Sequence, residues 1–318
     1  MSRPIVIATR GSALALAQSN MMKAACERAL PGRVIELKII KTTGDKMQTA
    51  AMTRPAEQST KGLFTKELEV ALLAGEADLA VHSLKDLPTE LPGGLTLGAT
   101  PPREDVRDVL IVRADSPATA SEPIKTLQSG GTIATSSSRR AAQIQALRPD
   151  LKITPIRGNV GTRIKKLLAQ PELGGTILAA AGLNRLKFQI GPDSTLQGND
   201  VPDGVKALVI PLDEMLPCVG QAAIGIEIRK DDPAMADLCA KLNDPATLAC
   251  VTAERAFLRA MGGGCLSPVA AYATISGNQL RIRAVALKEN GLSRAELTGP
   301  VSQAEQLGSD LAGRIWRR

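Results

Sequence analysis

The chain has 318 residues and a formal net charge of +7, with 44% hydrophobic but only 2% aromatic residues. Because single hydrophobic cores stop growing at about 250–300 residues, we expect two or three domains with aliphatic cores. The net charge predicts an anionic partner, but three Phe, one Trp and one Tyr offer few stacking surfaces for single-stranded nucleic acid, so a small polyanion fits better.

Neither a membrane span nor a metal site is predicted. No apolar run reaches about 18 residues, and Met1–Ile7 leads directly into a strand pattern without a signal-peptide segment. The cysteines form no C-x-x-C pair, which disfavours zinc and favours free thiols in a reducing cytoplasm. The five cysteines are Cys26, Cys218, Cys239, Cys250 and Cys265.

Strand and helix patterns alternate in the first part of the chain. The predicted elements are a strand at Pro4–Thr9, a helix at Ser12–Leu30, a strand at Val34–Ile40, a helix whose buried face is Phe64, Leu68, Ala71 and Leu72, and a strand at Asp78–Leu84. The polar stretch Thr42–Thr60 has no helical period and is long for a plain loop, which predicts a mobile lid.

A second series with the same alternation follows. Its predicted elements are a strand at Gly131–Thr135, a helix at Ser138–Leu147, a strand at Leu151–Ile156, a helix facing inward with Val160, Ile164, Leu167 and Leu168, and a strand at Thr176–Ala180. Alternating strands and helices predict an α/β fold with mostly parallel sheets and helices on both faces.

The last third of the chain has a different pattern. Asp244-Pro245 predicts a helix start, and Gly262–Gly264 predicts its stop rather than a ligand loop. Leu280–Ala286 alternates as a one-faced strand does, and Gly277-Asn278 and Asn290-Gly291 are hairpin turn signals. A final helix buries Val301, Ala304, Leu307, Leu311 and Ile315. These elements predict a small α+β domain.

Polar and basic side chains recur where strands end and helices begin. The segments are Thr9–Ser12 with Arg10, Ser83–Asp86, Thr135–Arg140, Arg157–Arg163 and Asn184-Arg185. Ligands of open α/β sheets bind at such ends, helix N-termini attract anions, and the arginine fork matches carboxylates and phosphates. A single arginine there is usually a solvated charge and serines can merely cap a helix, so the repetition is what favours an anion site. His82, the one histidine, lies inside a predicted strand and is expected to be a packed, hydrogen-bonded residue.

Several motifs together resemble the porphobilinogen deaminase (hydroxymethylbilane synthase) family. They follow the family's order over nearly the whole chain: Ile7–Ser12, Lys61–Glu69, Ala80–Pro88, Thr135–Arg140, Arg157–Arg163 and Gly263–Cys265. The resemblance implies condensation of four porphobilinogen units with release of ammonia, on a dipyrromethane cofactor joined to a cysteine by a thioether. It also implies a monomeric cytoplasmic enzyme of tetrapyrrole biosynthesis that binds neither nucleic acid nor membranes.

The resemblance also implies a domain plan. The fold would be two periplasmic-binding-protein-like domains, with mostly parallel sheets covered by helices on both faces, plus a small α+β C-terminal domain. The first domain would comprise residues 1–104 with 222–243, the second 105–221 and the third 244–318. The family usually has glycine where this chain has Ala222, and Gln58–Thr60 is less glycine-rich than is usual.

Site residues follow from the same resemblance. Asp86 matches the catalytic aspartate and Cys265 the cofactor-bearing cysteine, and no metal is implied. The positions matching the family's cofactor and substrate contacts are Arg10, Ser12, Lys61, Lys85, Thr135, Ser136, Ser137, Arg139, Arg140, Arg157, Gly158, Arg163, Arg185 and Gln221. Two alternatives stay open: a bilobal small-anion binding or regulatory protein without catalysis, which leaves Asp86 and Cys265 without a task, and a nucleic-acid protein.

Overall fold

The computed structural model describes residues 3–45, 64–199, 201–263, 268–289 and 291–317, and the chain separates into two compact units. The first unit is Met1–Glu104 with Ala223–Thr252, and the second is Asp105–Ala222 with Ala253–Arg318. By this division residues 253–318 fall in the second unit and residues 244–252 in the first. The three-domain plan with its boundaries therefore stays a prediction.

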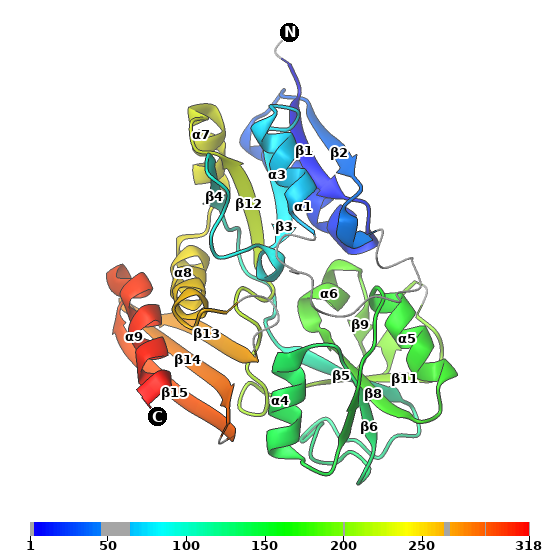
Figure 1. Cartoon of the computed structure of the whole chain (residues 1–318). Coiled ribbons are helices and arrows are strands. Elements are labelled where there is room, and N and C mark those ends of the chain that lie inside the picture. Colours follow the sequence, from blue (N-terminus) through cyan, green and yellow to red (C-terminus); the bar gives the residue numbers. More distant parts are fainter. Residues whose placement is uncertain (1–2, 46–63, 200, 264–267, 290, 318) are drawn as a thin grey trace. The chain divides into compact units, whose positions relative to one another are not determined.

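Five strands form the sheet of the first unit in the order β2-β1-β3-β12-β4 (Figure 1). Their bounds are β1 (Ile5–Arg10), β2 (Ile35–Ile40), β3 (Leu79–Ser83), β4 (Leu95–Ala99) and β12 (Ile224–Arg229). β1 pairs in parallel with β2 and β3, whereas β12 pairs antiparallel with β3 and β4. Four strands therefore run in one direction, and β12 is reversed.

Helices cover both faces of this sheet. They are α1 (Ala13–Ala29), α3 (Lys66–Leu73), α7 (Pro233–Leu242) and the short 3₁₀ helix η1 (Leu84–Asp86). Adjacent residues of a strand point to opposite faces. Accordingly Ile7 packs in one core with Met22 of α1 and Cys239 of α7, while Ala8 packs in another with Leu68 of α3.

The second unit contains a sheet with the order β11-β5-β8-β6-β7. Its strands are β5 (Asp108–Arg113), β6 (Thr132–Ala134), β7 (Lys152–Thr154), β8 (Leu173–Ala179) and β11 (Val205–Val209), and a small hairpin is formed by β9 (Gln189–Ile190) and β10 (Leu196–Gln197). The helices are α4 (Ser138–Leu147), α5 (Val160–Ala169) and α6 (Ala180–Arg185). Ile144 of α4 packs against one face of β5, and Ile164 of α5 and Leu183 of α6 pack against the other.

The two sheets share one topology. From the β7 edge the second sheet runs β7-β6-β8-β5-β11, which matches β2-β1-β3-β12-β4 strand for strand, with β5 reversed as β12 is. The α/β fold class with mostly parallel sheets is therefore confirmed.

A three-stranded antiparallel sheet with two helices forms the C-terminal part. Its elements are α8 (Pro245–Ala260), β13 (Val269–Ser276), β14 (Gln279–Lys288), β15 (Gly291–Pro300), η2 (Val301–Gln303) and α9 (Ala304–Arg317). The helices approach closely at Gly308, where a Cβ atom would lie 2.1 Å from the Ala253 carbonyl oxygen. Gly262, at φ +65°, follows the end of α8, which confirms the predicted helix stop.

Two sequence predictions need correction. Phe64 lies outside α3, which begins at Lys66, so it does not belong to that helix's buried face. Strands β4, β5, β11 and β12 were not predicted, and all four extend the two sheets beyond the strands of the predicted βα series. The helix predicted at Ser138–Leu147 has those bounds in the structure.

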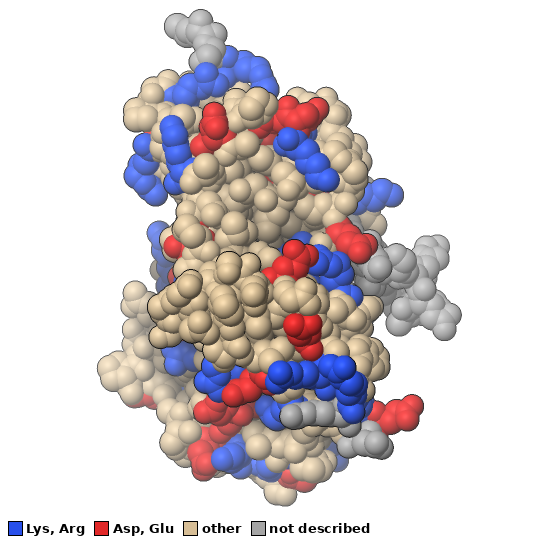
Figure 2. All heavy atoms as spheres, turned by 90° about the vertical axis from the view of Figure 1, so that its left-hand side faces the viewer, with Lys and Arg blue, Asp and Glu red and all other residues tan. Residues whose placement is uncertain are grey.

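Charges of both signs are mixed over the face of the molecule in Figure 2, where Lys and Arg alternate with Asp and Glu. None of the helices in the described ranges is long and apolar enough to cross a membrane.

Candidate functional site

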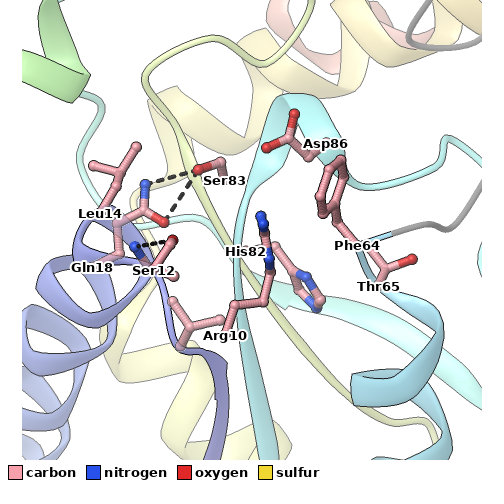
Figure 3. A pocket seen from close by; sticks show the side chains of 11 residues that line it. Arg10, Ser12, Leu14, Gln18, Phe64, Thr65, His82, Ser83 and Asp86 are labelled. Atoms are coloured by element: carbon pink, nitrogen blue, oxygen red, sulfur yellow. Dashed lines mark hydrogen bonds between the residues drawn. The ribbon is translucent and has the colours of Figure 1, made fainter. Parts of the chain in front are cut away.

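A pocket opens at the carboxyl ends of β1 and β3 in the first unit (Figure 3). The pocket is lined by Arg10, Ser12, Leu14, Ala15, Gln18, Phe64, Thr65, Val81, His82, Ser83 and Asp86. The structure thus brings together three predicted site residues, Arg10, Ser12 and Asp86.

Arg10 is held in this pocket by a carboxylate and an aromatic ring. Its Nη2 donates to Asp45 Oδ1 at 2.5 Å and its Nε to Oδ2 at 3.3 Å, while the guanidinium carbon lies 4.1 Å from the centre of the Phe64 ring. Burial alone would raise the pKa of Asp45, but hydrogen bonds from Arg10 and Thr42 lower it. A guanidinium has five N–H donors, so donors remain for a ligand carboxylate.

Asp86 ends the 3₁₀ turn that follows β3. The turn is anchored because Leu84 N donates to the Ala223 carbonyl at 3.0 Å and Leu84 itself is buried. Asp86 and the neighbouring Lys85 are both half-buried. The turn therefore delivers the Asp86 side chain to the pocket, on the side of Phe64 in Figure 3.

A buried polar pair lies at the base of the same pocket. His82 Nε2 is 2.9 Å from Glu227 Oε2, and the side chains are 4% and 0% exposed. Burial raises the pKa of nearby Glu69, and the charge of Glu227 raises it further. His82 is thus packed and hydrogen-bonded, as the sequence predicted.

In the second unit, the matching strand β6 is followed by three hydroxyl-bearing residues, Thr135, Ser136 and Ser137. Ser137 caps α4 by accepting from Arg140 N, and Thr135 Oγ1 accepts from Ser137 N at 3.2 Å. Ser136 Oγ donates to the Ile156 carbonyl at 2.9 Å and is exposed. The segment is both a helix cap and an accessible donor surface at a helix N-terminus.

Arg139 and Arg140 face inward, onto one shared carboxylate. Arg139 Nη2 donates to Asp108 Oδ2 at 2.8 Å, and Arg140 Nη2 donates to Asp108 Oδ1 at 2.7 Å. Gln221 Nε2 donates to the same Oδ1 at 3.0 Å. Burial alone would raise the pKa of Asp108, but the two arginine charges and their hydrogen bonds outweigh it and hold that pKa far below its ordinary value.

Arg163 lies close to this cluster from the first turns of α5. Its Nε donates to the Gly158 carbonyl at 2.8 Å, and Gly158 has φ +122° with Thr162 so near that a Cβ atom would clash at 2.6 Å. Burial lowers the pKa of Arg163, and the charge of Arg140 lowers it further. Arg157 is exposed just before this turn.

Arg185, at the end of α6, is tied to the segment that precedes the crossing into the first unit. Its Nη2 donates to the Ala222 carbonyl at 2.5 Å. Ala222 has φ +70°, in the left-handed region that disfavours a side chain, and is buried against Val106 and Ala181. A backbone position that favours glycine therefore carries alanine in this chain, at the cost of roughly 1–2 kcal/mol.

Two predicted site residues, Lys61 and Cys265, and most of the predicted lid lie outside the described residues. The other four cysteines are free thiols. Burial raises the pKa of Cys26 to about 11 and that of Cys239 to about 12. Within the described ranges no three His, Cys, Asp or Glu side chains gather as metal ligands.

Three residues of the site were not found from the sequence: Asp45, Asp108 and the ring of Phe64 as a partner of Arg10. Asp108 did leave a signal, because it begins the apolar run Val109–Val112, and a charge at the start of a buried strand needs an internal partner. Asp45 lies in a polar segment and left none.

Comparison with known proteins shows the family of the chain. A family model described as porphobilinogen deaminase, dipyromethane cofactor binding domain, matches residues 5–237, and one described as porphobilinogen deaminase, C-terminal domain, matches residues 248–316. The porphobilinogen deaminase of Syntrophobacter fumaroxidans is 43% identical over 311 residues, 97% of this chain and 93% of the relative. That of Thermus thermophilus is 42% identical over 313 residues, 98% and 94% of the two chains.

Among solved structures, the periplasmic aliphatic sulphonate binding protein SsuA from Escherichia coli is similar, with 14% identity and a TM-score of 0.43 over 100% of this chain and 89% of that one. The family models together match residues 5–237 and 248–316, and the two curated relatives exceed 40% identity over nearly full length. The chain belongs to the porphobilinogen deaminase family.

Proposed function

We propose that this chain condenses four porphobilinogen molecules head to tail, with release of ammonia at each step, to give hydroxymethylbilane in tetrapyrrole biosynthesis. Its membership of the family supports the reaction. Each pyrrole of the substrate carries an acetate and a propionate, so the growing product is a polyanion. Such a ligand needs fixed cations at several points.

The observation that carries the proposal is an excess of positive charge at the strand ends of the second unit. Arg139 and Arg140 share Asp108, and Arg163 lies near enough to Arg140 for its pKa to be lowered by that charge. Two guanidinium groups thus share one carboxylate, a net charge of +1, and the Arg163 guanidinium adds a further positive charge near Arg140. Anionic groups of a ligand would neutralise this excess.

A dipyrromethane fits the same donors. It carries two acetates and two propionates, which match the guanidinium groups and the N-terminal N–H groups of α4. When bound, the group supplies the pyrrole carbon to which the first substrate is joined. In the proposed arrangement Arg140, Arg157 and Arg163 hold its carboxylates, while Arg185 contacts the chain of pyrroles.

Cys265 is the proposed attachment point, and the other four thiols are proposed to stay unmodified. Burial raises the pKa of Cys26 and Cys239 to about 11 and about 12, so their reactive thiolates are scarce at neutral pH. Peptide mapping of active protein should find the added mass on Cys265 alone. Fully active protein with an unmodified Cys265 would contradict the assignment.

Asp86 is the proposed catalytic residue. Ammonia leaves only when the amine is protonated, and its departure leaves a cation on the substrate pyrrole. A carboxylate at this point can first position the proton and then stabilise the cation. Arg10, on the same pocket, would hold a substrate carboxylate and so keep the reacting carbon near Asp86.

The decisive variant is Asp86→Asn, which keeps the shape of the side chain and removes its charge. We expect turnover to fall by about a hundredfold or more, with an unchanged melting temperature and substrate still bound by arginine. Glu90→Gln, an exposed acid four residues away, is the matched control and should retain normal turnover. Normal turnover in Asp86→Asn would instead assign Asp86 to the turn alone.

Location and assembly belong to the same proposal. The free thiols Cys26, Cys218, Cys239 and Cys250 support a reducing cytoplasm. The aromatic content of 2% supports a small-molecule substrate over nucleic acid. We infer a monomer, which sedimentation of the loaded protein would test.

A further inference from the structure

We propose that Asp108 is the positioning residue for cofactor assembly: it fixes the orientation of Arg139 and Arg140 so that their remaining donors meet the dipyrromethane carboxylates. The proposal rests on the function proposed above. Asp108 itself does not touch the ligand in this proposal, because its side chain is 0% exposed.

The geometry of the carboxylate is the first argument. Each Asp108 oxygen accepts from a different arginine, Oδ2 from Arg139 at 2.8 Å and Oδ1 from Arg140 at 2.7 Å, and Oδ1 also accepts from Gln221 at 3.0 Å. One rigid group therefore sets the direction of three side chains that the family resemblance places in the binding site.

Backbone carbonyls accept hydrogen bonds from the other terminal nitrogen of each of the two arginines. Arg139 Nη1 donates to the Leu216 carbonyl at 2.6 Å, and Arg140 Nη1 donates to the Ile177 carbonyl at 2.7 Å. Each guanidinium is thus held at both terminal nitrogens and can neither rotate nor swing to follow a ligand. Side chains fixed in this way lose little further conformational entropy when a ligand binds.

Charge is the second argument. One carboxylate between two buried guanidinium groups leaves a net charge of +1, so Asp108 stabilises the pair without neutralising it. A fully neutralised pair would have no attraction for an anion, and a pair without a carboxylate would repel itself in a medium of low dielectric constant. The surplus remains available to a ligand.

The first unit contains a matched cluster without this role. Asp78 also bridges two arginines, accepting from Arg3 at 2.6 Å and from Arg229 at 3.4 Å, and its side chain is 3% exposed. It precedes β3, at the end of the strand opposite to the pocket. Asp78→Asn therefore controls for the loss of a buried bridging carboxylate away from any site.

The test compares Asp108→Asn with Asp78→Asn by intact mass and by melting temperature. Asn presents one acceptor and one donor, so one of the two arginines must lose its partner. We expect Asp108→Asn to carry about tenfold less cofactor than wild type, since loss of one charge-assisted hydrogen bond corresponds to a factor of ten or more, and to gain no mass on incubation with porphobilinogen. Asp78→Asn should melt earlier but carry cofactor as wild type does.

Two outcomes would overturn the proposal: full loading of Asp108→Asn, or equal loss of loading in Asp78→Asn. If Asp108→Asn does not fold, Asp108→Glu, which keeps the charge and shifts it by one methylene, replaces it. Reduced loading of folded Asp108→Glu supports positioning, and full loading contradicts it. Failure of the proposed function is distinguishable, because wild-type protein itself would then carry no dipyrromethane mass.

Discussion

The two α/β units share one strand order but treat their arginines differently. At the end of β1, Arg10 is 18% exposed and paired with Asp45, which is 25% exposed, so its environment is partly water. At the end of the matching strand β6, Arg139 and Arg140 are 5% and 8% exposed and share a carboxylate with no exposure at all. Identical topology thus supports an accessible cation in one unit and an immobilised pair in the other.

The two units also differ in whether an acidic residue follows the matching strands β3 and β8. Asp86 follows β3, whereas the matching strand β8 is followed by Ala180, Ala181 and Gly182, which offer no titratable side chain. In our proposal the first unit therefore supplies the reacting carboxylate and a cation for ligands that come and go, and the second supplies cations for a ligand that stays. Depth of burial is the physical property that separates the two tasks.

The largest expected difference between the units is in stability. Asp108→Ala leaves two buried guanidinium groups without their carboxylate, and we expect a loss of about 3–5 kcal/mol in the free energy of unfolding. Asp45→Ala breaks a partly exposed pair and should cost about 1 kcal/mol or less. Urea unfolding of both variants measures the two values, and similar losses would contradict the contrast in burial.

Asp108 and Asp45 should also differ in how they make the stability of the folded protein depend on pH. The folded-state pKa of Asp108 is held below its ordinary value of 3.8, so its contribution to stability is present above that value and is lost as the pH falls below it. Asp108→Asn should remove this part of the acid sensitivity, whereas Asp45→Asn, with a smaller lowering of its pKa, should remove less.

The second difference should appear in the stage at which each variant fails. Arg140→Leu removes a cation that is held by Asp108 and the Ile177 carbonyl. We expect this variant to be purified as apoprotein, without the added mass of the dipyrromethane. Arg10→Leu should leave the cofactor in place and raise KM for porphobilinogen by about tenfold or more, because one charge-assisted hydrogen bond is lost. Intact mass and steady-state kinetics separate the two, and equal loading with equal turnover would show that the units do not divide the work.

The smallest effect concerns the equivalent helix caps. Ser12 accepts from Ala15 N at the start of α1, and Ser137 accepts from Arg140 N at the start of α4. Replacing either serine by alanine should cost about 1 kcal/mol. Only Ser137→Ala is expected to lower cofactor loading as well, because that cap also sets the backbone of Arg140. Equal loading in the two variants would restrict Ser137 to capping.

Much of this arrangement could be predicted from local signals. The helix predicted at Ser138–Leu147 has those bounds in the structure. The strands that lead to Arg10 and Asp86 were also predicted, and their observed bounds, Ile5–Arg10 and Leu79–Ser83, differ by one residue at each end. The resemblance of several motifs then gave the reaction, which composition and periodicity alone did not.

What escaped prediction depends on contacts between distant residues. Asp108 and Arg140 are 32 positions apart, and no local pattern indicates which of the many acids an arginine will meet. Phe64 looked like part of a helix face because its spacing to Leu68 is helical, but the chain enters α3 two residues later. β12 went unpredicted because its partner strands precede it by more than a hundred residues.

The position of β12 has a consequence for biosynthesis. It lies between β3 and β4, so the first sheet stays open until Arg229 has been made, 130 residues after Ala99 at the end of β4 (229 minus 99). At ordinary rates of translation that interval is on the order of ten seconds. The second sheet uses only strands between Asp108 and Val209, all of which leave the ribosome earlier than β12. The sheet that begins first is therefore completed after the second sheet, and during that wait the edge of β3 is exposed to any strand or chaperone that reaches it.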